Sequence, residues 1–415
     1  MEGMKVEPAT SLQFKAEREN CGREIFPDRP DQSSMLGFRQ QFPYIDRYAY
    51  FNYGGQGLMS QETMQAIHAA QEHLQQIAPF SNAAGTWVDQ EIAALREAIA
   101  TELGTTSDTI TLTEDTTVGC NIALWGLAWQ AGDHVLLTDC EHQGIVATVQ
   151  ELQHRFGLEV SVFPLQDAET TEMMVERLQQ ALQPNTRLVV LSHILWNTGQ
   201  ILPLAEMVDR CHANGSQILV DAAQSVGILP LDLTVLQADF YAFTGHKWWC
   251  GPAGVGGLYV RPEAQATLRP TFMGWRGIQT DFQNRPTGWA SGGKRYEVAT
   301  SAVFLYPGLR AAIASHQACG TASERYQMIC DRSQHLWQAL QAIPEVIMIC
   351  KHPPASGLIA FQCQSGKHRQ LVAALESQGI LVRLLLDPNC VRACTHYFTL
   401  DREIEQLVAA IAEFV

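Results

Sequence analysis

The segment Phe243–Cys250, with the sequence FTGHKWWC, places a single lysine where it could carry covalent cofactor chemistry. Lys247 follows a short apolar run and precedes the glycine-rich segment Gly251–Gly257. Upstream, Asp221 ends another apolar run, Ile218–Val220. A lysine amine forms Schiff bases with aldehydes, and a carboxylate can keep a ring nitrogen protonated. A carboxylate and a lysine at the ends of successive strands are therefore what pyridoxal phosphate (PLP) chemistry requires.

Both residues also have ordinary structural interpretations. Lysine side chains are mostly exposed and solvated in folded proteins. Asp221 could cap a helix that begins with the Ala-Ala-Gln sequence after it. Bulky and glycine residues surround Lys247, and this setting favours a functional amine over a surface one.

The composition predicts a globular protein with more than one domain. Hydrophobic residues make up 46% of the 415 residues and charged residues only 17%, which argues against disorder. A chain of this length can form two domains with substantial cores. The formal net charge of −15 at pH 7 argues against a nucleic acid as the main partner.

The cysteines and the apolar runs bear on the cellular compartment. The eleven cysteines are scattered singly and none forms a CxxC pair, which favours reduced thiols over a disulfide framework. Zinc-ligand spacing is absent, so we expect no metal site. No apolar run is long enough to span a membrane, and the first residues lack the apolar core of a secretory signal. We therefore expect a cytoplasmic enzyme that does not associate with membranes.

Short apolar runs alternate with helical segments through the middle of the chain, which predicts a mainly parallel sheet with crossover helices. The candidate strands are Thr109–Leu112, His134–Thr138, Glu159–Pro164, Arg187–Ser192, Gln217–Asp221, Phe240–Thr244 and Gly257–Val260. Ligands of such sheets bind at the carboxyl ends of the strands. His193, Asp221 and Lys247 lie at or just beyond such ends, so they could face one crevice.

The pattern divides the chain into three regions. Residues 1–35 are polar and unpatterned, and we expect a loosely attached extension. Residues 60–300 form the predicted large PLP-binding domain, in which Ser60 caps a first helix and a second helix ends at Gly104. Residues 36–59 together with 301–415 form the predicted small α+β domain. Its expected elements are helices over Phe304–Leu340 and Arg402–Phe414 and strands over Val346–Cys350, Gly357–Cys363 and Ile380–Leu384.

Seven short motifs occur in the order and spacing of one known family. They are Thr116-Thr117, Glu141-His142, Ser192-His193 with Asn197-Thr-Gly199, Asp221-Ala-Ala-Gln224, Thr244-Gly-His-Lys247, Arg295–Thr300 and Arg392. Over residues 40–415 the chain resembles the class V aminotransferases and, within them, the cysteine desulfurase group. The resemblance implies an α/β fold of the aspartate aminotransferase-like type (fold type I), with a mainly parallel seven-stranded sheet in the large domain and a smaller α+β domain.

The same resemblance implies roles around the PLP ring. Lys247 would hold PLP as a Schiff base and later move protons at the substrate. Asp221 would pair with the ring nitrogen, and His142 would stack on the face of the ring. Gln224 and Asn197 would lie near the ring hydroxyl. Individually, His142 could also cap a helix and Asn197 could belong to a turn before a glycine.

Other matched residues would bind the phosphate. They are Thr116, Thr117, Thr244 and His246, helped by backbone N–H groups where a helix begins after Asp115. Taken alone, the threonine pair could be an ordinary helix cap, and His193 could be a core histidine without a family role. Thr300 matches a residue that reaches the phosphate of the neighbouring subunit in this family, which implies a homodimer with shared active sites.

Two arginines near the C-terminus match the needs of an amino-acid substrate. Arg392 matches the family's arginine for the α-carboxylate, which the planar guanidinium can bind with two hydrogen bonds. Arg383 could reach the same cleft, although a surface position is equally compatible with the sequence. Trp275 could line the distal part of a substrate pocket, and packing explains it equally well.

The segment between these arginines departs from the family pattern. Cysteine desulfurases carry a long loop here with a cysteine that takes sulfur from the substrate, whereas this chain has only Leu384–Val391. Cys390 stands two residues before Arg392, and a structural thiol is the favoured interpretation. The chain thus looks like a cystine C–S lyase of the C-DES type. It would eliminate sulfur from L-cystine, and more weakly from L-cysteine, to give cysteine persulfide, pyruvate and ammonia.

The persulfide could supply sulfur to iron–sulfur cluster assembly proteins, a use that rests on the resemblance alone. The alternatives are a true cysteine desulfurase, which converts L-cysteine to L-alanine with a protein-bound persulfide on Cys390 or Cys394, and another class V aminotransferase-type enzyme. Loss of catalysis in a PLP-fold scaffold is a further alternative, against which the retained Lys247 argues.

Overall fold

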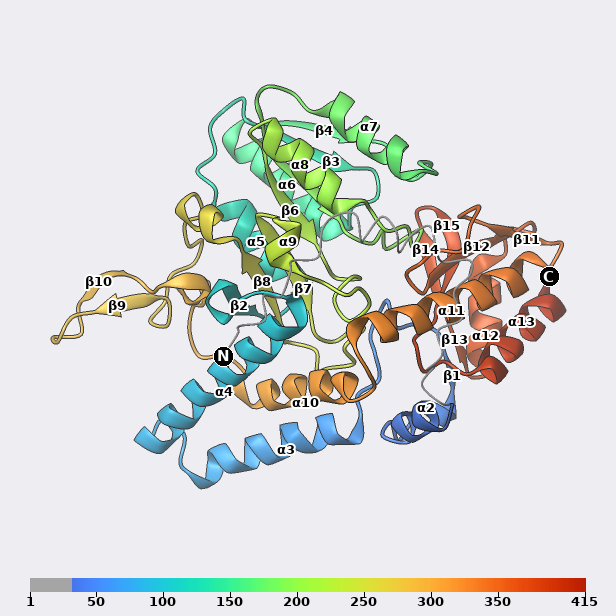
Figure 1. The fold of residues 1–415 in the computed structure, drawn as a ribbon, viewed down its shortest axis with the longest axis horizontal. Helices are drawn as coiled ribbons and strands as arrows, with labels where there is room; N and C mark the ends of the chain where they lie inside the picture. Colours follow the sequence, from blue (N-terminus) through green and yellow to red (C-terminus); the bar gives the residue numbers. More distant parts are fainter. Residues whose placement is uncertain (1–31) are drawn as a thin grey trace, which may run out of the picture.

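The computed structural model describes residues 32–415. The polar extension predicted over residues 1–35 lies outside this range, apart from its last four residues, which open helix α2 (Gln32–Arg39). Figure 1 shows two units, one built on a large sheet and the other formed by the C-terminal part of the chain. Among the described residues, no helix is both long and apolar enough to cross a lipid bilayer.

The large unit is built on a seven-stranded sheet, as the sequence predicts. Its strands run in the order β2-β8-β7-β6-β5-β3-β4, and only β8 is antiparallel to its neighbours. The strands are β2 (Ile110–Thr113), β3 (His134–Thr138), β4 (Glu159–Phe163), β5 (Thr186–Ser192), β6 (Gln217–Asp221), β7 (Phe240–Thr244) and β8 (Gly256–Val260). The predicted strands differ from these by at most one residue at either end.

Alternate residues of the buried strands face two separate apolar cores. Val189 and Leu191 of β5 face one core, and Leu188 and Val190 face the other. Helices α4, α7 and α8 pack into the first core, and α5 and α6 pack into the second. The helices of this unit are α3 (Gln61–Gln76), α4 (Asn82–Leu103), α5 (Thr116–Gly126), α6 (Gln143–Phe156), α7 (Thr171–Ala181), α8 (Leu204–Ala213) and α9 (Leu233–Leu236). The result is a sheet between two helical layers, in which Ser60 caps α3 and Gly104 ends α4 as predicted.

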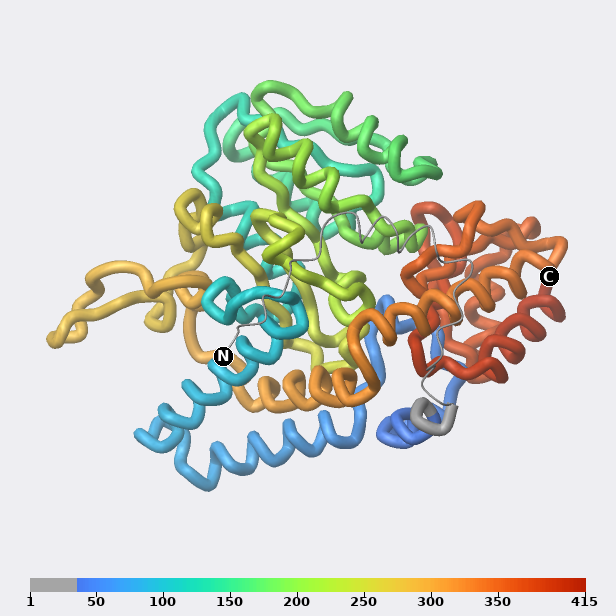
Figure 2. Tube along the Cα trace, in the orientation of Figure 1, coloured from blue at the N-terminus to red at the C-terminus, as the bar shows by residue number. Residues whose placement is uncertain are grey.

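The C-terminal unit has an antiparallel sheet of its own, in the order β11-β12-β15-β14. These strands are β11 (Val346–Met348), β12 (Leu358–Cys363), β14 (Arg383–Leu386) and β15 (Asn389–Cys394). Helices α11 (Ala322–Gln341), α12 (His368–Ser377) and α13 (Asp401–Phe414) cover it. Strand β1 (Ala49–Tyr50) pairs in parallel with β13 (Ile380–Leu381), which brings the N-terminal segment beside this unit (Figure 2).

The helix predicted over Phe304–Leu340 is two helices, α10 (Tyr306–Gln317) and α11. The break occurs at Gly320, which has a φ of +120°, a backbone conformation that glycine adopts far more readily than other residues. Thr321 and Glu324 then form a capping box that starts α11. Helix α10 packs against α3 and α4 and contributes to the first core of the large unit. We therefore propose a domain boundary after α10, later than the expected one at residue 301.

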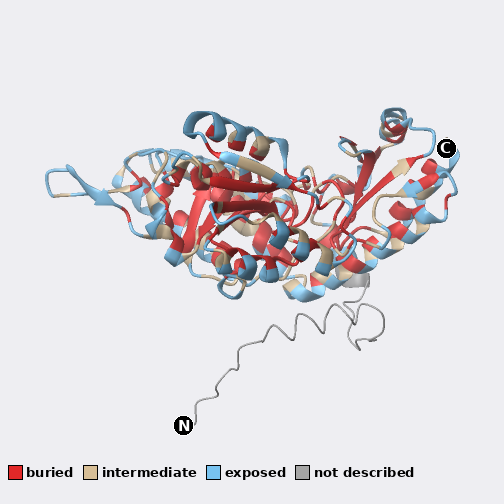
Figure 3. Cartoon of the chain, turned by 90° about the horizontal axis from the view of Figure 1, so that it is seen from above, coloured by how far each residue is buried: buried red, intermediate tan, exposed pale blue. Residues whose placement is uncertain are grey.

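Two hairpins are absent from the sequence-based prediction. One is β14–β15, which replaces the expected short loop between the two arginines. The other joins β9 (Ile278–Thr280) to β10 (Pro286–Trp289) and projects from one end of the molecule as an exposed finger (Figures 1 and 3). Short 3₁₀ turns complete the fold, at Ile45–Arg47, Ser107–Thr109, Pro262–Ala266, Gly292–Tyr296 and Val303–Leu305.

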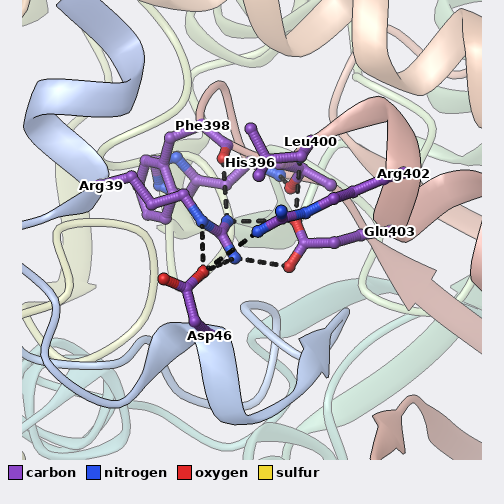
Figure 4. Close-up of polar contacts among 8 residues, drawn as sticks. Arg39, Asp46, His396, Phe398, Leu400, Arg402 and Glu403 are labelled. Carbon is purple, nitrogen blue, oxygen red and sulfur yellow. Dashed lines mark hydrogen bonds and ion pairs between the residues drawn. The ribbon is translucent and has the colours of Figure 1, made fainter.

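A buried ion pair fastens α2 to the C-terminal unit (Figure 4). Arg39 donates two hydrogen bonds to Glu403, of 3.1 and 2.7 Å, and a third of 3.2 Å to the backbone oxygen of Phe398. The side chains of Arg39 and Glu403 are only 4% and 8% exposed. The exposed carboxylate of Asp46 accepts a further hydrogen bond from Arg39. Because all these groups are partnered, the burial of two charges is compensated.

Replacing Arg39 by methionine should destabilise the protein by about 3 kcal/mol, because the Glu403 carboxylate is left buried without a cation. The midpoint of urea unfolding measures the effect. Arg402→Met is the matched control, since the Arg402 side chain is 70% exposed and its ion pair with Asp46, at 3.4 Å, lies at the surface. The free energy of unfolding of this variant should stay within about 0.5 kcal/mol of wild type. Equal effects of the two substitutions would contradict this account of Arg39.

Candidate active site

The carboxyl ends of the parallel strands bring the predicted residues to one edge of the sheet. In the strand register Ser192 lies opposite Asp221, and Asp221 lies opposite Ala242, so β5, β6 and β7 end together. Asn197 and Lys247 follow β5 and β7 within a few residues. The turns after parallel strands therefore assemble a common crevice, as expected for an open α/β sheet.

The Lys247 amine is the chemically distinctive group of this edge. Burial lowers the pKa of Lys247 from 10.5 to about 8, because desolvation disfavours the ammonium form. The Asp221 carboxylate opposes this shift, and the Arg392 guanidinium adds to it. A larger fraction of the amine is thus neutral and nucleophilic near neutral pH than in an exposed lysine. The interaction of these three charges places Arg392, from the C-terminal unit, at the same site as the two strand-end residues.

Asp221 is buried at the end of β6 with one protein hydrogen bond. Its Oδ1 accepts a 2.9 Å bond from the backbone N–H of Ala223. The residues that follow form turns, so the predicted alternative of a helix cap is realised only as a local turn. Desolvation raises the pKa of Asp221, while the backbone bond and the interactions with Lys247 and His142 oppose that rise. A cation beside its free oxygen would stabilise the ionised form further.

The amino terminus of α5 forms a cradle for an anion. Asp115 caps the helix by accepting a 2.9 Å bond from the N–H of Val118. Thr116 is buried and its Oγ1 has no partner among the described residues, whereas Thr117 is exposed. Free N–H groups and a hydroxyl at a helix N-terminus suit a phosphate group.

Thr244 and His246 lie next to each other on the Lys247 side of this edge. The Oγ1 of Thr244 and the Nδ1 of His246 are 2.6 Å apart. Burial, together with the positive charge of Lys247, lowers the pKa of His246, so the neutral imidazole is favoured. One of their two protons is used in the bond between them, so the pair keeps one hydrogen-bond donor for an anion without adding a permanent charge.

His142 begins α6 and caps it. Its Nδ1 accepts a 3.2 Å bond from the N–H of Gly144, which is the helix-cap role considered from the sequence. The side chain is exposed, and its ring meets Trp196 edge-on at 5.9 Å between centroids. Capping fixes the ring by its Nδ1 edge and leaves a face available for stacking on a flat ligand.

Asn197 and Gln224 differ in what their amides can still bind. The Oδ1 of Asn197 is buried without a partner among the described residues. Both polar atoms of Gln224 are used by the protein, Nε2 by the backbone oxygen of Gly54 and Oε1 by the indole N–H of Trp248, each at 2.9 Å. Gln224 thus joins the N-terminal segment to the residue after Lys247. Its place beside a ring hydroxyl stays a prediction.

Arg392 is buried on β15 and faces the large unit. Its Nη1 donates a 2.7 Å bond to the backbone oxygen of Trp196, while its Nε has no partner in the described part of the chain. Arg383 lies directly opposite Arg392 in the β14–β15 register, so both side chains emerge on the same face of the sheet. Arg383 is exposed at the rim and Arg392 is buried behind it. This arrangement could bind two carboxylates at different depths.

The two cysteines that flank Arg392 are fully buried on the same strand. Burial raises the pKa of the Cys390 thiol to about 12, although the nearby Arg392 opposes that shift. Cys394 is also 0% exposed. The hairpin turn at Asp387-Pro388 leaves no loop between the arginines that could carry either thiol toward a substrate.

Trp275 and Thr300 are both exposed. Trp275 lines a cavity of about 290 Å³ whose other walls include Arg96 of α4 and Lys294. None of the residues that line this cavity belongs to the crevice around Lys247. The placement of Trp275 in a substrate pocket and of Thr300 at a phosphate stays a prediction.

Glu141 is a site residue whose role the sequence pattern leaves open. Its carboxylate accepts bonds from the hydroxyl of Thr138, at 2.5 Å, and from the N–H and hydroxyl of Ser192, at 3.1 and 2.9 Å. It therefore ties the end of β3 to the end of β5 and fixes the neighbouring His142. Burial raises the pKa of Glu141 to about 8. Its motif, Glu141-His142, marks the position, but only the fold reveals the partners.

Comparison with known proteins matches this geometry to a family. The model of the family described as aminotransferase class-V matches residues 50–404. A cysteine desulfurase of Klebsiella pneumoniae is 30% identical over 336 residues, which cover 77% of this chain and 81% of that protein. The chain belongs to the class-V aminotransferase family. The predicted family and fold type are thereby confirmed, together with the expectation of an enzyme from a PLP-dependent family.

Solved structures of the cystine C–S lyase C-DES are similar to the chain at 48% sequence identity, covering 90% of it and 99% of C-DES. One contains the reaction product cysteine persulfide and has a TM-score of 0.88. The other is a lysine mutant with glycine covalently linked to the PLP cofactor and has a TM-score of 0.89. The sequence-based resemblance to C-DES is confirmed.

The residues at the strand ends fit PLP on their own chemistry. Three buried polar atoms that lack protein partners are Thr116 Oγ1, Asn197 Oδ1 and Arg392 Nε. Buried polar groups in native proteins are almost always hydrogen-bonded, so these atoms point to a polar ligand. The neutral amine of Lys247 and the buried carboxylate of Asp221 add the two groups that a PLP aldehyde and ring nitrogen require.

In the cofactor-free protein the Lys247 amine should titrate at about pH 8. The reactive neutral form accumulates as the pH rises through this value, so acetylation at Lys247 should accelerate between roughly pH 7 and 9. Acetic anhydride labelling followed by peptide mass spectrometry measures the rate. Because the charge of Arg392 lowers this pKa, Arg392→Gln should shift the midpoint upward. A wild-type midpoint near 10.5 would contradict the burial of the amine.

Proposed function

We propose that this chain is a PLP-dependent carbon–sulfur lyase that acts on L-cystine by β-elimination and, more slowly, on L-cysteine. The observation that carries the proposal is the short β14–β15 hairpin, with its two buried cysteines, where a desulfurase would need a mobile loop with a nucleophilic thiol. The 48% identity to C-DES, which has been solved with cysteine persulfide, supports the same reaction.

In the proposed reaction Lys247, which would hold PLP covalently between turnovers, takes the proton from the substrate Cα. PLP, when bound, supplies an electron-withdrawing ring that accepts the electron pair left on Cα. Asp221 would keep the ring nitrogen protonated, and His142 would cover the ring face. The phosphate would be bound by Thr116, Thr117, Thr244 and His246. Asn197 would interact with the ring hydroxyl, and Gln224 would support that side of the site.

The Cβ–S bond then breaks, and its electron pair leaves with the sulfur. From cystine the leaving group is the anion of cysteine persulfide, which is less basic than an ordinary thiolate and therefore leaves more readily. The remaining three-carbon enamine takes up water and gives pyruvate and ammonia. Arg392 binds the α-carboxylate of the reacting half, and Arg383 at the rim is free for the distal carboxylate of cystine.

A substrate panel tests this reaction. L-Cystine should give pyruvate together with persulfide, and the Cys390→Ser/Cys394→Ser double variant should keep the same products, because neither thiol takes part. Lys247→Ala should lose the activity. Pyruvate is measured with lactate dehydrogenase and persulfide by cyanolysis. Formation of L-alanine and protein-bound persulfide from L-cysteine, lost in the double variant, would establish a cysteine desulfurase instead, the activity of the Klebsiella relative.

We further propose that the active enzyme is a homodimer with shared sites. Phe272, Met273 and Trp275 are 69, 65 and 63% exposed on the segment that leads into the β9–β10 hairpin. Clustered exposed apolar side chains are typical of an interface. Thr300, exposed on the loop that leaves this region, would reach the phosphate of the partner's PLP, and Trp275 would line the partner's substrate pocket.

Mixing two inactive variants tests the shared site. Thr300→Glu places a negative charge against the partner's phosphate, and Lys247→Ala removes the lysine of its own site. Random pairing should restore about a quarter of the wild-type activity, because half of the dimers are mixed and each has one intact site. Cystine lyase activity measured after subunit exchange gives the answer. Mixtures as inactive as the separate variants would place Thr300 outside the partner's site.

Persulfide release also suggests a physiological role. The product could transfer its outer sulfur to iron–sulfur cluster assembly proteins, for which kinship with cysteine desulfurases is the support. A cytoplasmic location goes with the scattered cysteines of the sequence.

A further inference from the structure

Two buried histidines are hydrogen-bonded to the backbone of the two residues that follow Lys247. The Nε2 of His396 lies 3.0 Å from the backbone oxygen of Trp248, and the Nε2 of His316 lies 2.9 Å from that of Trp249. Both histidines are about 2% exposed or less. His316 lies in the last turn of α10, and His396 follows β15, so neither belongs to β7 or to the turn after it that carries Lys247.

The partners of these rings fix their protonation. A carbonyl oxygen only accepts, so each Nε2 carries a proton. The Nδ1 of His396 is 3.0 Å from the backbone N–H of Tyr397, which only donates, so His396 is neutral. The Nδ1 of His316 lies 2.7 Å from the Tyr397 hydroxyl and, in the neutral ring, accepts a hydrogen bond from it. Burial lowers the pKa of both histidines, which agrees with two neutral rings.

This hydrogen bonding decides against a metal. Cys250, His316 and His396 bring three possible ligand atoms within 4.8 Å of one another. Metal ligation by a neutral histidine needs a free lone pair on a ring nitrogen. Here each Nδ1 lone pair accepts a bond from Tyr397, and each Nε2 donates to a carbonyl. The two histidines therefore form a hydrogen-bonded unit whose Nε2 donors bind the turn at residues 246–250, called the lysine turn below.

The same turn is held at its other carbonyls. The backbone oxygen of His246 accepts from the N–H of Gly57 at 2.8 Å, and that of Lys247 accepts from the N–H of Cys250 at 3.0 Å. With the two histidine bonds, four consecutive carbonyls from residue 246 to residue 249 are partnered. Cys250 has a φ of +53°, an unfavourable conformation that persists only where the surroundings impose it.

We propose that His316, His396 and Tyr397 are positioning residues that hold the Lys247 turn so that its amine reaches the Cα proton of the substrate. They form one unit, the histidine clamp, that connects the C-terminal part of the chain to the lysine. Phe38 of α2 packs on the outside of this clamp, with ring centroids 5.7 Å from His316 and 5.6 Å from Tyr397. The catalytic role given to Lys247 here rests on the proposed function, whereas the backbone contacts of the clamp do not depend on that function.

Substitution of the clamp tests its role in the purified holoenzyme. His396→Leu removes the donor to Trp248, whereas His396→Gln keeps an N–H near the Nε2 position. A displaced amine should lower kcat for L-cystine by on the order of 10- to 100-fold and change KM little, and glutamine should restore most of it. Tyr397→Phe removes a single hydroxyl and keeps the packing, so it tests the clamp even where His396→Leu fails to fold.

His368→Leu is the matched control. His368 is also a buried histidine of the C-terminal unit and accepts a backbone bond, from the N–H of Cys363 at 3.0 Å, but it is not part of the lysine turn. Hydrogen exchange followed by mass spectrometry should become faster in the peptide over residues 245–251 for His396→Leu and Tyr397→Phe, and not for His368→Leu.

This exchange measurement needs no substrate, so it separates the clamp from the proposed function. If the wild-type protein releases no pyruvate from cystine but exchange at 245–251 is still faster in the clamp variants, the clamp is kept and the lyase is refuted. Unchanged exchange at 245–251 in both clamp variants, or an unchanged kcat for an active enzyme, would overturn the clamp. A stoichiometric divalent metal in the wild-type protein, lost in His396→Leu, would also overturn it.

Discussion

The burial of one amine is the constraint on which the rest of this structure depends. Burial of Lys247 favours its neutral form at a lower pH than in an exposed lysine, because desolvation disfavours the ammonium form. Asp221 and Arg392 act on it with opposite signs, so its pKa of about 8 reflects a balance among burial, a carboxylate and a guanidinium. The carboxylate comes from the large sheet and the guanidinium from the small one. The site therefore exists only where the two units meet.

The junction of the units is accordingly dense in aromatic and hydrogen-bonded contacts. Tyr53, Trp248, Tyr397 and Phe398 share one buried cluster, to which the N-terminal segment, the lysine turn and the C-terminal segment all contribute. Leu358 of β12 belongs to the same cluster, and Gly199 approaches it so closely that a Cβ would lie 2.1 Å from the Leu358 backbone oxygen; its φ is +83°. Such close contact between the units gives Arg392 and Lys247 a fixed relation.

The sequence predicted the features that depend on interactions between residues close together in the chain. Apolar runs bounded by polar turns located all seven strands of the large sheet, and the polar residues after them marked the crevice. The break at Gly320 depends on a capping box, Thr321 with Glu324, whose signal is present in the sequence but competes with an uninterrupted helical pattern. The β14–β15 hairpin and the histidine clamp depend on pairing between distant segments: His396 is 148 residues from the carbonyl it holds. No periodicity encodes such a contact.

The hairpin also supports the proposed fate of the electrons once a proton has left the substrate Cα. Sulfur transfer requires a thiolate that can approach the substrate sulfur, and the availability of a thiolate falls as its pKa rises. Burial holds the Cys390 thiol at a pKa of about 12, and a two-stranded hairpin with a tight turn keeps it in the sheet. With no nucleophile at the sulfur, the proposed reaction lets the electron pair leave with the Cβ substituent. A leaving group of low basicity, such as a persulfide, gains most in that reaction, and for this reason we propose the disulfide of cystine as a better substrate than the thiol of cysteine.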